Sequence, residues 1–191
     1  MRYTFLVLMI AVLAGCQSAR VANPLTTELA GNDPQQQLDF WHTLATRPVT
    51  SNDEAFHGLL LFTDGQDPAG SYGERVSTLK ERKMLPANFD KSPELAVTRG
   101  DLAVAICRIL EVRGGVMMRL TNAHPRYATR ELQFLDVYPP SSSWQTFSGN
   151  EFLGIIGRVE DVQRGNPADV PAAVLPSEMQ QGDAPAPPAQ Q

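Results

Sequence analysis

Apolar residues recur along the chain in runs that a polar capping residue introduces, and the clearest run begins at Thr98. Thr98 and Asp101 have the spacing of a capping box, in which the hydroxyl accepts from the backbone N–H three residues on and the carboxylate reaches back. The segment from Leu102 to Leu110 is almost wholly apolar, and Arg108 is its only charged residue. This pattern predicts a capped helix that is mostly buried.

A second run of the same design begins at Ser148. Ser148 and Glu151 repeat the box spacing, an apolar segment follows, and Arg158 stands ten residues after the cap, as Arg108 does in the first run. Apolar residues of matching spacing also precede both caps. They are Leu79, Met84, Leu85 and Pro86 before one, and Leu132, Val137, Tyr138 and Pro139 before the other.

An earlier and weaker copy of the design has a capping box that starts at Thr50 or at Ser51. The sequence therefore predicts three helix–loop–helix units, near 38–62, 79–110 and 132–160. Because no alternating strand pattern of useful length is present, we expect an all-α fold.

The middle unit resembles the S-layer homology (SLH) domain of bacterial envelope proteins. Thr98-Arg99-Gly100-Asp101, followed by Leu102-Ala103, is close to the Thr-Arg-Ala-Glu motif that opens the second helix of that domain. The other two units lack the arginine. The resemblance implies three units in a pseudo-threefold bundle that binds cell-wall polysaccharide or peptidoglycan. It also implies that Arg99 contacts the polymer, with Thr98 and Asp101 beside it.

The residues themselves allow two interpretations of Arg99. At the first turn of a helix, its guanidinium can point outward into the groove between units and bind a carboxylate or a pyruvylated sugar by paired hydrogen bonds. Alternatively, it is solvated or pairs with Glu94 or Asp101. We expect Trp144 to fill the core near the last loop, and Arg75 to be solvated on a helix that begins at Tyr72.

The N-terminus has the pattern of an export signal. An apolar stretch over residues 5–13 is too short to span a bilayer. Leu13-Ala14-Gly15-Cys16 then resembles the lipobox of bacterial lipoproteins, which implies cleavage after residues 1–15 and acylation of Cys16. A plain signal peptide with an incidental cysteine is the alternative. Acyl chains on Cys16 would hold the protein on a lipid bilayer, and Gln17 favours the outer membrane by the enterobacterial sorting rule.

Composition divides the rest of the chain and limits its partners. We interpret residues 16–33 as a lipidated tether, 34–164 as the SLH-like helical domain, and 165–191, rich in Pro, Ala and Gln, as a disordered tail. The net charge is −5, from 16 basic and 21 acidic residues. This balance argues against a nucleic-acid partner.

Candidate catalytic and metal-binding residues are few. His42, His57 and His124 fall on different expected elements, and none has a second ligand at metal spacing. Cys107 lies within the apolar run and is interpreted as a small buried hydrophobe. No two carboxylates stand at a catalytic spacing. We therefore expect no cofactor and no enzyme activity.

These observations predict a non-catalytic, lipid-anchored cell-envelope protein that binds or scaffolds cell-wall material. The alternative is a protein-interaction module that recruits another envelope protein.

Overall fold

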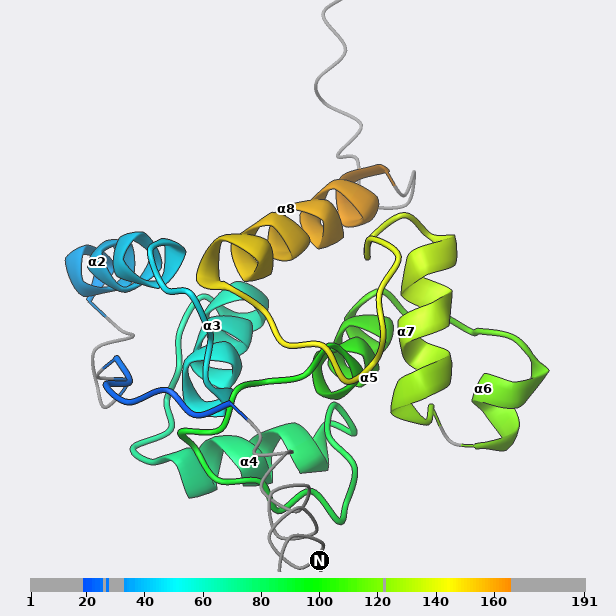
Figure 1. Cartoon of the computed structure of the whole chain (residues 1–191), viewed down its shortest axis with the longest axis horizontal. Coiled ribbons are helices and arrows are strands. Elements are labelled where there is room, and N and C mark those ends of the chain that lie inside the picture. Colours follow the sequence, from blue (N-terminus) through cyan, green and yellow to red (C-terminus); the bar gives the residue numbers. More distant parts are fainter. Residues whose placement is uncertain (1–18, 26, 28–32, 122, 166–191) are drawn as a thin grey trace, which may run out of the picture.

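The computed structural model describes residues 19–25, 27, 33–121 and 123–165, and the fold of this part is helical. The expected signal peptide, Cys16 and residues 166–191 of the tail lie outside the described residues. The helices are α2 (Pro34–Ala45), α3 (Asn52–Asp64), α4 (Tyr72–Glu81), α5 (Arg99–Ile109), α6 (Val116–Leu120), α7 (Pro125–Phe134) and α8 (Gly149–Gly165) (Figure 1). In this part, the extended segments pair only through isolated bridges and form no strands, which confirms the all-α class.

Three helices, α3, α5 and α8, begin at the capping boxes that the sequence predicted. The paired residues are Ser51 with Glu54, Thr98 with Asp101, and Ser148 with Glu151. In the first box the register that forms is the one starting at Ser51, whose Oγ accepts from the Glu54 N–H at 3.2 Å. Each box satisfies backbone N–H groups that a helix leaves without an internal partner, so the local sequence fixes where each helix starts.

Backbone hydrogen bonds join the three segments that precede these helices. The Val97 N–H donates to the Thr50 carbonyl at 3.0 Å, and the Thr50 N–H donates to the Phe147 carbonyl at 2.9 Å. Further along, Thr98 and Thr146 form an isolated bridge. The three capped helix starts therefore hold one another in place.

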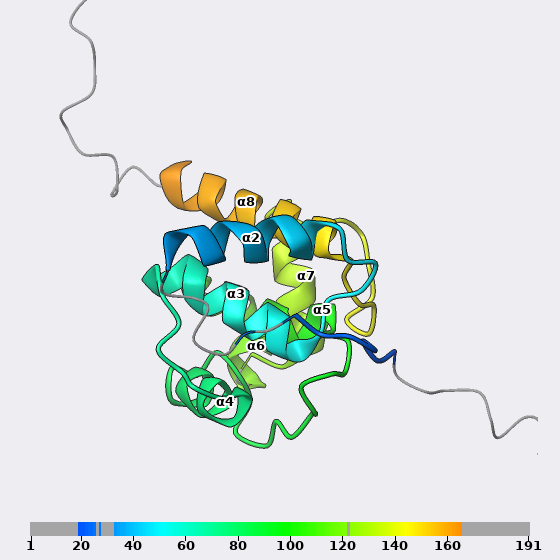
Figure 2. The ribbon, with the colours of Figure 1, turned by 90° about the vertical axis from the view of Figure 1, so that its left-hand side faces the viewer.

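Helix packing follows a regular order along the chain. α3 packs against α4, α5 packs against α7, and α8 returns to pack against α2. Figures 1 and 2 both show α8 lying beside α2. At this contact Gly149 is required, because a side chain there would overlap the carbonyl group of Leu44. The fully buried core side chains include Leu44, Phe56, Leu60, Leu79, Leu102, Ile106, Leu132 and Phe152.

α5 ends at Ile109, and Glu111 then adopts a positive φ of 51° and turns the chain. One expectation for the loops is wrong. Trp144 is 81% exposed and does not fill the core. The segment before His124 contains the short helix α6.

Residues 19–25 and 27, which fall within the expected tether over 16–33, lie against the domain, and we name them the N-terminal strap. The Ala96 N–H donates to the Ala19 carbonyl, and the Val21 N–H donates to the Glu94 carbonyl, both at 2.8 Å. The strap is thus pinned to the domain. No helix in the described part of the chain is long and apolar enough to cross a membrane.

Candidate functional site

Thr98 and Asp101, two of the three predicted site residues, are occupied by the cap of α5. Thr98 Oγ1 donates to Asp101 Oδ2 at 2.6 Å, and the same carboxylate oxygen accepts from Lys91 Nζ at 2.5 Å. Asp101 is buried. These contacts leave the pair little capacity for a ligand, so their role in the structure is to start the helix.

Arg99, the third predicted site residue, lies inside the molecule and not in an open groove. Its side chain is 6% exposed, its guanidinium carbon lies 4.9 Å from the centre of the Phe147 ring, and Nη2 donates to Glu151 Oε1 at 3.0 Å. The expected partner Glu94 instead pairs with Arg20 at 2.5 Å. Arg99 therefore connects the cap of α5 to the cap of α8.

Two polar atoms of Arg99 remain unused. Within the described ranges, Nε and Nη1 are buried and have no hydrogen-bond partner. On the other side of the ion pair, the pKa of Glu151 lies below its usual value, chiefly because the backbone N–H of Ser148 donates to the carboxylate, with Arg99 adding to the effect. Glu151 is thus ionised at neutral pH and keeps its contact with Arg99.

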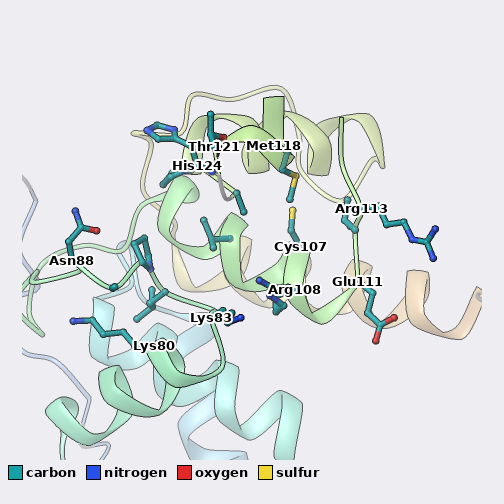
Figure 3. A pocket seen from close by; sticks show the side chains of 17 residues that line it. Lys80, Lys83, Asn88, Cys107, Arg108, Glu111, Arg113, Met118, Thr121 and His124 are labelled. Atoms are coloured by element: carbon teal, nitrogen blue, oxygen red, sulfur yellow. Dashed lines mark hydrogen bonds between the residues drawn. The ribbon is translucent and has the colours of Figure 1, made fainter. Parts of the chain in front are cut away.

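A cleft of about 1040 Å³ opens beside the C-terminal half of α5, between the end of α4 and the segment that contains α6 (Figure 3). Its floor is apolar and is formed by Leu85, Val104, Cys107 and Met118. Lys80, Lys83 and Arg108 lie on one side of the opening, and Thr121 and His124 lie on the other. The sequence does not indicate this cleft, because its residues come from three separate parts of the chain.

The cleft is electropositive, in contrast to the chain as a whole. Four cationic side chains and a single carboxylate, Glu111, line it, whereas the net charge of the protein is −5. Among the residues that the structure describes, no carboxylate pairs with Lys80, Lys83 or Arg108. These three cations are therefore available to an anionic ligand.

Cys107, at the floor of the cleft, is an apolar packing residue, as predicted. It is buried, and its thiol lies 3.7 Å from the Ala128 carbonyl oxygen. Burial, with a smaller contribution from the charge of Glu131, raises the pKa of the thiol to about 12. A thiol with that pKa is not a nucleophile at neutral pH.

A buried polar network, which the sequence analysis missed, surrounds Arg75. This side chain is fully buried, and its guanidinium binds the carboxylates of Asp67 and Asp53 and donates to the Thr27 carbonyl at 2.7 Å. His57 Nδ1 lies 2.6 Å from Asp67 Oδ2. Because Arg75, Asp67 and His57 are closed to solvent, the network serves the fold and fixes the strap at Thr27.

The expectation that Arg75 is solvated is wrong for a reason visible in the spacing. Arg75 precedes Leu79 by four residues and so shares the inward face of α4. An arginine on an apolar face, with aspartates in a neighbouring loop and helix start, is the signal that could have indicated the buried network.

Comparison with protein-family models, with curated proteins and with solved structures finds no match to the chain. In the described part of the chain, no group of three or more His, Cys, Asp or Glu side chains could hold a metal ion. The function is therefore inferred from the residues and contacts described above.

Proposed function

We propose that this chain is a non-catalytic, lipid-anchored protein of the bacterial cell envelope that binds an anionic cell-wall polymer in the cleft lined by Lys80, Lys83 and Arg108. One observation carries the proposal: on an acidic protein, three cations that have no carboxylate partner among the described residues stand over an apolar floor. Acidic glycans present carboxylates, which ammonium and guanidinium groups bind by charge-assisted hydrogen bonds.

The anchoring part of the proposal is supported by the lipobox-like Leu13-Ala14-Gly15-Cys16. Acyl chains on Cys16 would hold the protein on a bilayer, and Gln17 favours the outer membrane. Anchored in this way, the domain would bridge the membrane and the cell wall.

The architecture that supports this function is, in our proposal, three SLH-like units in a pseudo-threefold bundle. The pairs α2–α3, α4–α5 and α7–α8 would be the units, with α6 inserted between the second and the third. The three capping boxes and the packing order that returns α8 to α2 support this interpretation.

Arg99 has a different place in the proposal from the one that the SLH resemblance implied. Its contact with Glu151 and its position over Phe147 make it a joint between two units. The alternative binding site is at Arg99, beside Thr98 and Asp101. There, the two Arg99 nitrogens that have no partner among the described residues would bind the polymer directly.

Co-sedimentation with isolated cell-wall sacculi tests the proposal on the soluble chain from Gln17 onward. Replacing the three cations together (Lys80→Gln, Lys83→Gln, Arg108→Gln) is expected to weaken binding roughly tenfold or more, equivalent to about 1.4 kcal/mol. Added salt should weaken wild-type binding, because the cations are close to solvent. Binding unchanged by the triple substitution would refute the cleft as the site.

Two further variants sharpen the test. Arg126→Gln with Arg130→Gln removes exposed cations of α7 that lie outside the cleft, and it should leave binding unchanged. Arg99→Gln should also leave binding unchanged in the protein that remains folded. Loss of binding in folded Arg99→Gln alone would move the polymer to the start of α5.

The second candidate function, recruitment of another envelope protein, is favoured by the exposed apolar side chains of α6. Val116 is 71% exposed and Leu120 is 74% exposed, and Met117 stands between them. Clusters of this kind mark protein-interaction surfaces. If sacculi do not bind the chain, cross-linking in cells should capture a protein partner with the wild type. The double variant Val116→Ser, Leu120→Ser should fail to capture that partner.

A further inference from the structure

Trp144 is presented to solvent by a turn that is firmly fixed. The Gly100 N–H donates to the Ser143 carbonyl at 2.9 Å, and the Arg99 N–H donates to the Gln145 carbonyl at 2.7 Å. The backbone on both sides of Trp144 is thus hydrogen-bonded to the start of α5, while its indole is exposed. A large apolar ring held outward in this way favours contact with something outside the domain.

The N-terminal strap begins on the same side of the molecule. In the extended segment that leads into α5, the Ala96 N–H donates to the Ala19 carbonyl of the strap. Three residues later, the Arg99 N–H donates to the Gln145 carbonyl. Because an extended chain rises about 3.3 Å per residue, Ala96 and Arg99 lie about 10 Å apart along this segment, with the strap bonded to one edge and Gln145 to the other. Figure 2 shows the strap and the loop before α8 on the same side.

Cys16 is only three residues ahead of Ala19. Three extended residues span at most about 11 Å. A bilayer that holds acyl chains on Cys16 therefore comes within reach of the surface that carries Trp144. The strap, being paired with Glu94 and Ala96, gives the domain little freedom to turn away from that surface.

We propose that Trp144 is a bilayer-interface anchor, which docks this side of the domain on the membrane that carries Cys16. The inference rests on the proposed acylation of Cys16. Indole prefers the membrane–water interface, because its apolar body enters the hydrocarbon boundary while its N–H remains hydrated. The cleft residues of α5 lie in the C-terminal half of that helix, so docking through Trp144 leaves the cleft open to the wall.

Fluorescence quenching by brominated lipids tests the inference on the full chain, expressed with its N-terminal segment in a bacterium and reconstituted into phosphatidylcholine–phosphatidylglycerol vesicles. The contribution of Trp144 is the difference between the wild type and Trp144→Phe, which retains Trp41. Because Trp144 is exposed, this substitution removes no core packing. Lipids brominated near the headgroup are expected to abolish most of the Trp144 emission, and lipids brominated at the chain ends should quench it less.

A matched control moves the exposed indole from position 144 to another surface position. Phe134 is 84% exposed at the C-terminal end of α7. In the Trp144→Phe background, Phe134→Trp should report an indole that brominated lipid does not quench. Equal quenching at both positions would mean general adsorption and would overturn the inference.

The remaining outcomes separate this inference from the proposed function. If the protein floats with the vesicles but the Trp144 emission is not quenched, the docking inference fails and the lipid anchor stands. If the protein does not float at all, the acylation of Cys16 is refuted, and the docking inference with it. Protection of Trp144 by solubilised wall fragments, without quenching by lipid, would show that the indole stacks on sugar and would also overturn the inference.

Discussion

The buried guanidinium of Arg75 gives the sharpest test of the fold. In Arg75→Met, the carboxylates of Asp67 and Asp53 lose their cation, and the Thr27 carbonyl loses a donor. Removing one partner of a buried ion pair costs about 3–5 kcal/mol, because a charge stays buried without compensation. Asp67 keeps the hydrogen bond to His57, and the Asp53 side chain is partly exposed, so we expect a loss near 3 kcal/mol.

Equilibrium unfolding in urea measures this loss. With a slope of about 2 kcal/mol per molar urea, the unfolding midpoint of Arg75→Met should fall by about 1.5 M. The matched control is Arg82→Met, at the end of the same helix. Arg82 pairs with Asp64 at the surface at 2.7 Å, and an exposed pair of this kind contributes about 0–1 kcal/mol.

The same variant should also loosen the N-terminal strap, since Arg75 binds the Thr27 carbonyl. We expect faster trypsin cleavage after Arg20 in folded Arg75→Met than in the wild type or in Arg82→Met. If Arg75→Met and Arg82→Met unfold at the same urea concentration, the reasoning about the buried network is refuted.

Three further predictions concern single positions. The Cys107 thiol, with its pKa raised to about 12, should not react with iodoacetamide at pH 8 until the protein unfolds, which mass spectrometry of native and denatured samples measures. Gly149→Ala should destabilise the protein by about 3 kcal/mol, because its methyl would overlap the Leu44 carbonyl, whereas Gly154→Ala, with open space around it, should stabilise α8 by about 0.5–1 kcal/mol; thermal melting of both variants tests the contrast. Burial opposes ionisation of Asp67, but the hydrogen bonds to its carboxylate outweigh burial and hold its pKa below the usual value. The stability that ionised Asp67 contributes is therefore complete above about pH 3.9, and it is lost as the pH falls through the pKa of Asp67 in the folded state. The urea midpoint should therefore drop steeply below about pH 4, and a midpoint that is flat between pH 5 and 3 would contradict this account.

Local signals in the sequence determined the helix starts well. Thr98 with Asp101, and Ser148 with Glu151, act within a few residues, so their geometry can be predicted without the rest of the chain. The burial of Cys107 followed in the same way from the apolar run around it. These predictions are confirmed because capping and amphipathic pattern depend on near neighbours.

Long-range contacts explain the expectations that failed. Arg75 was expected in solvent. Its spacing from Leu79 places it on the inward face of α4, but only the fold brings Asp67 and Thr27 to its guanidinium. Trp144 was expected in the core on hydrophobicity alone, whereas its turn is fixed by backbone bonds to Arg99 and Gly100. The cationic cleft depends on bringing α4, α5 and the α6 segment together, which no local pattern specifies.

The N-terminal strap has a mechanical consequence for a chain held by its N-terminus. Tension applied ahead of Ala19 acts directly on the domain. The first hydrogen bond under load is the one from the Ala96 N–H to the Ala19 carbonyl. Beyond the three pairs with residues 94–96, the load reaches Thr27 and, through its carbonyl, the guanidinium of Arg75. In a chain held by its N-terminus, the lifetime of the domain under force therefore depends on how long the buried ion cluster around Arg75 resists rupture.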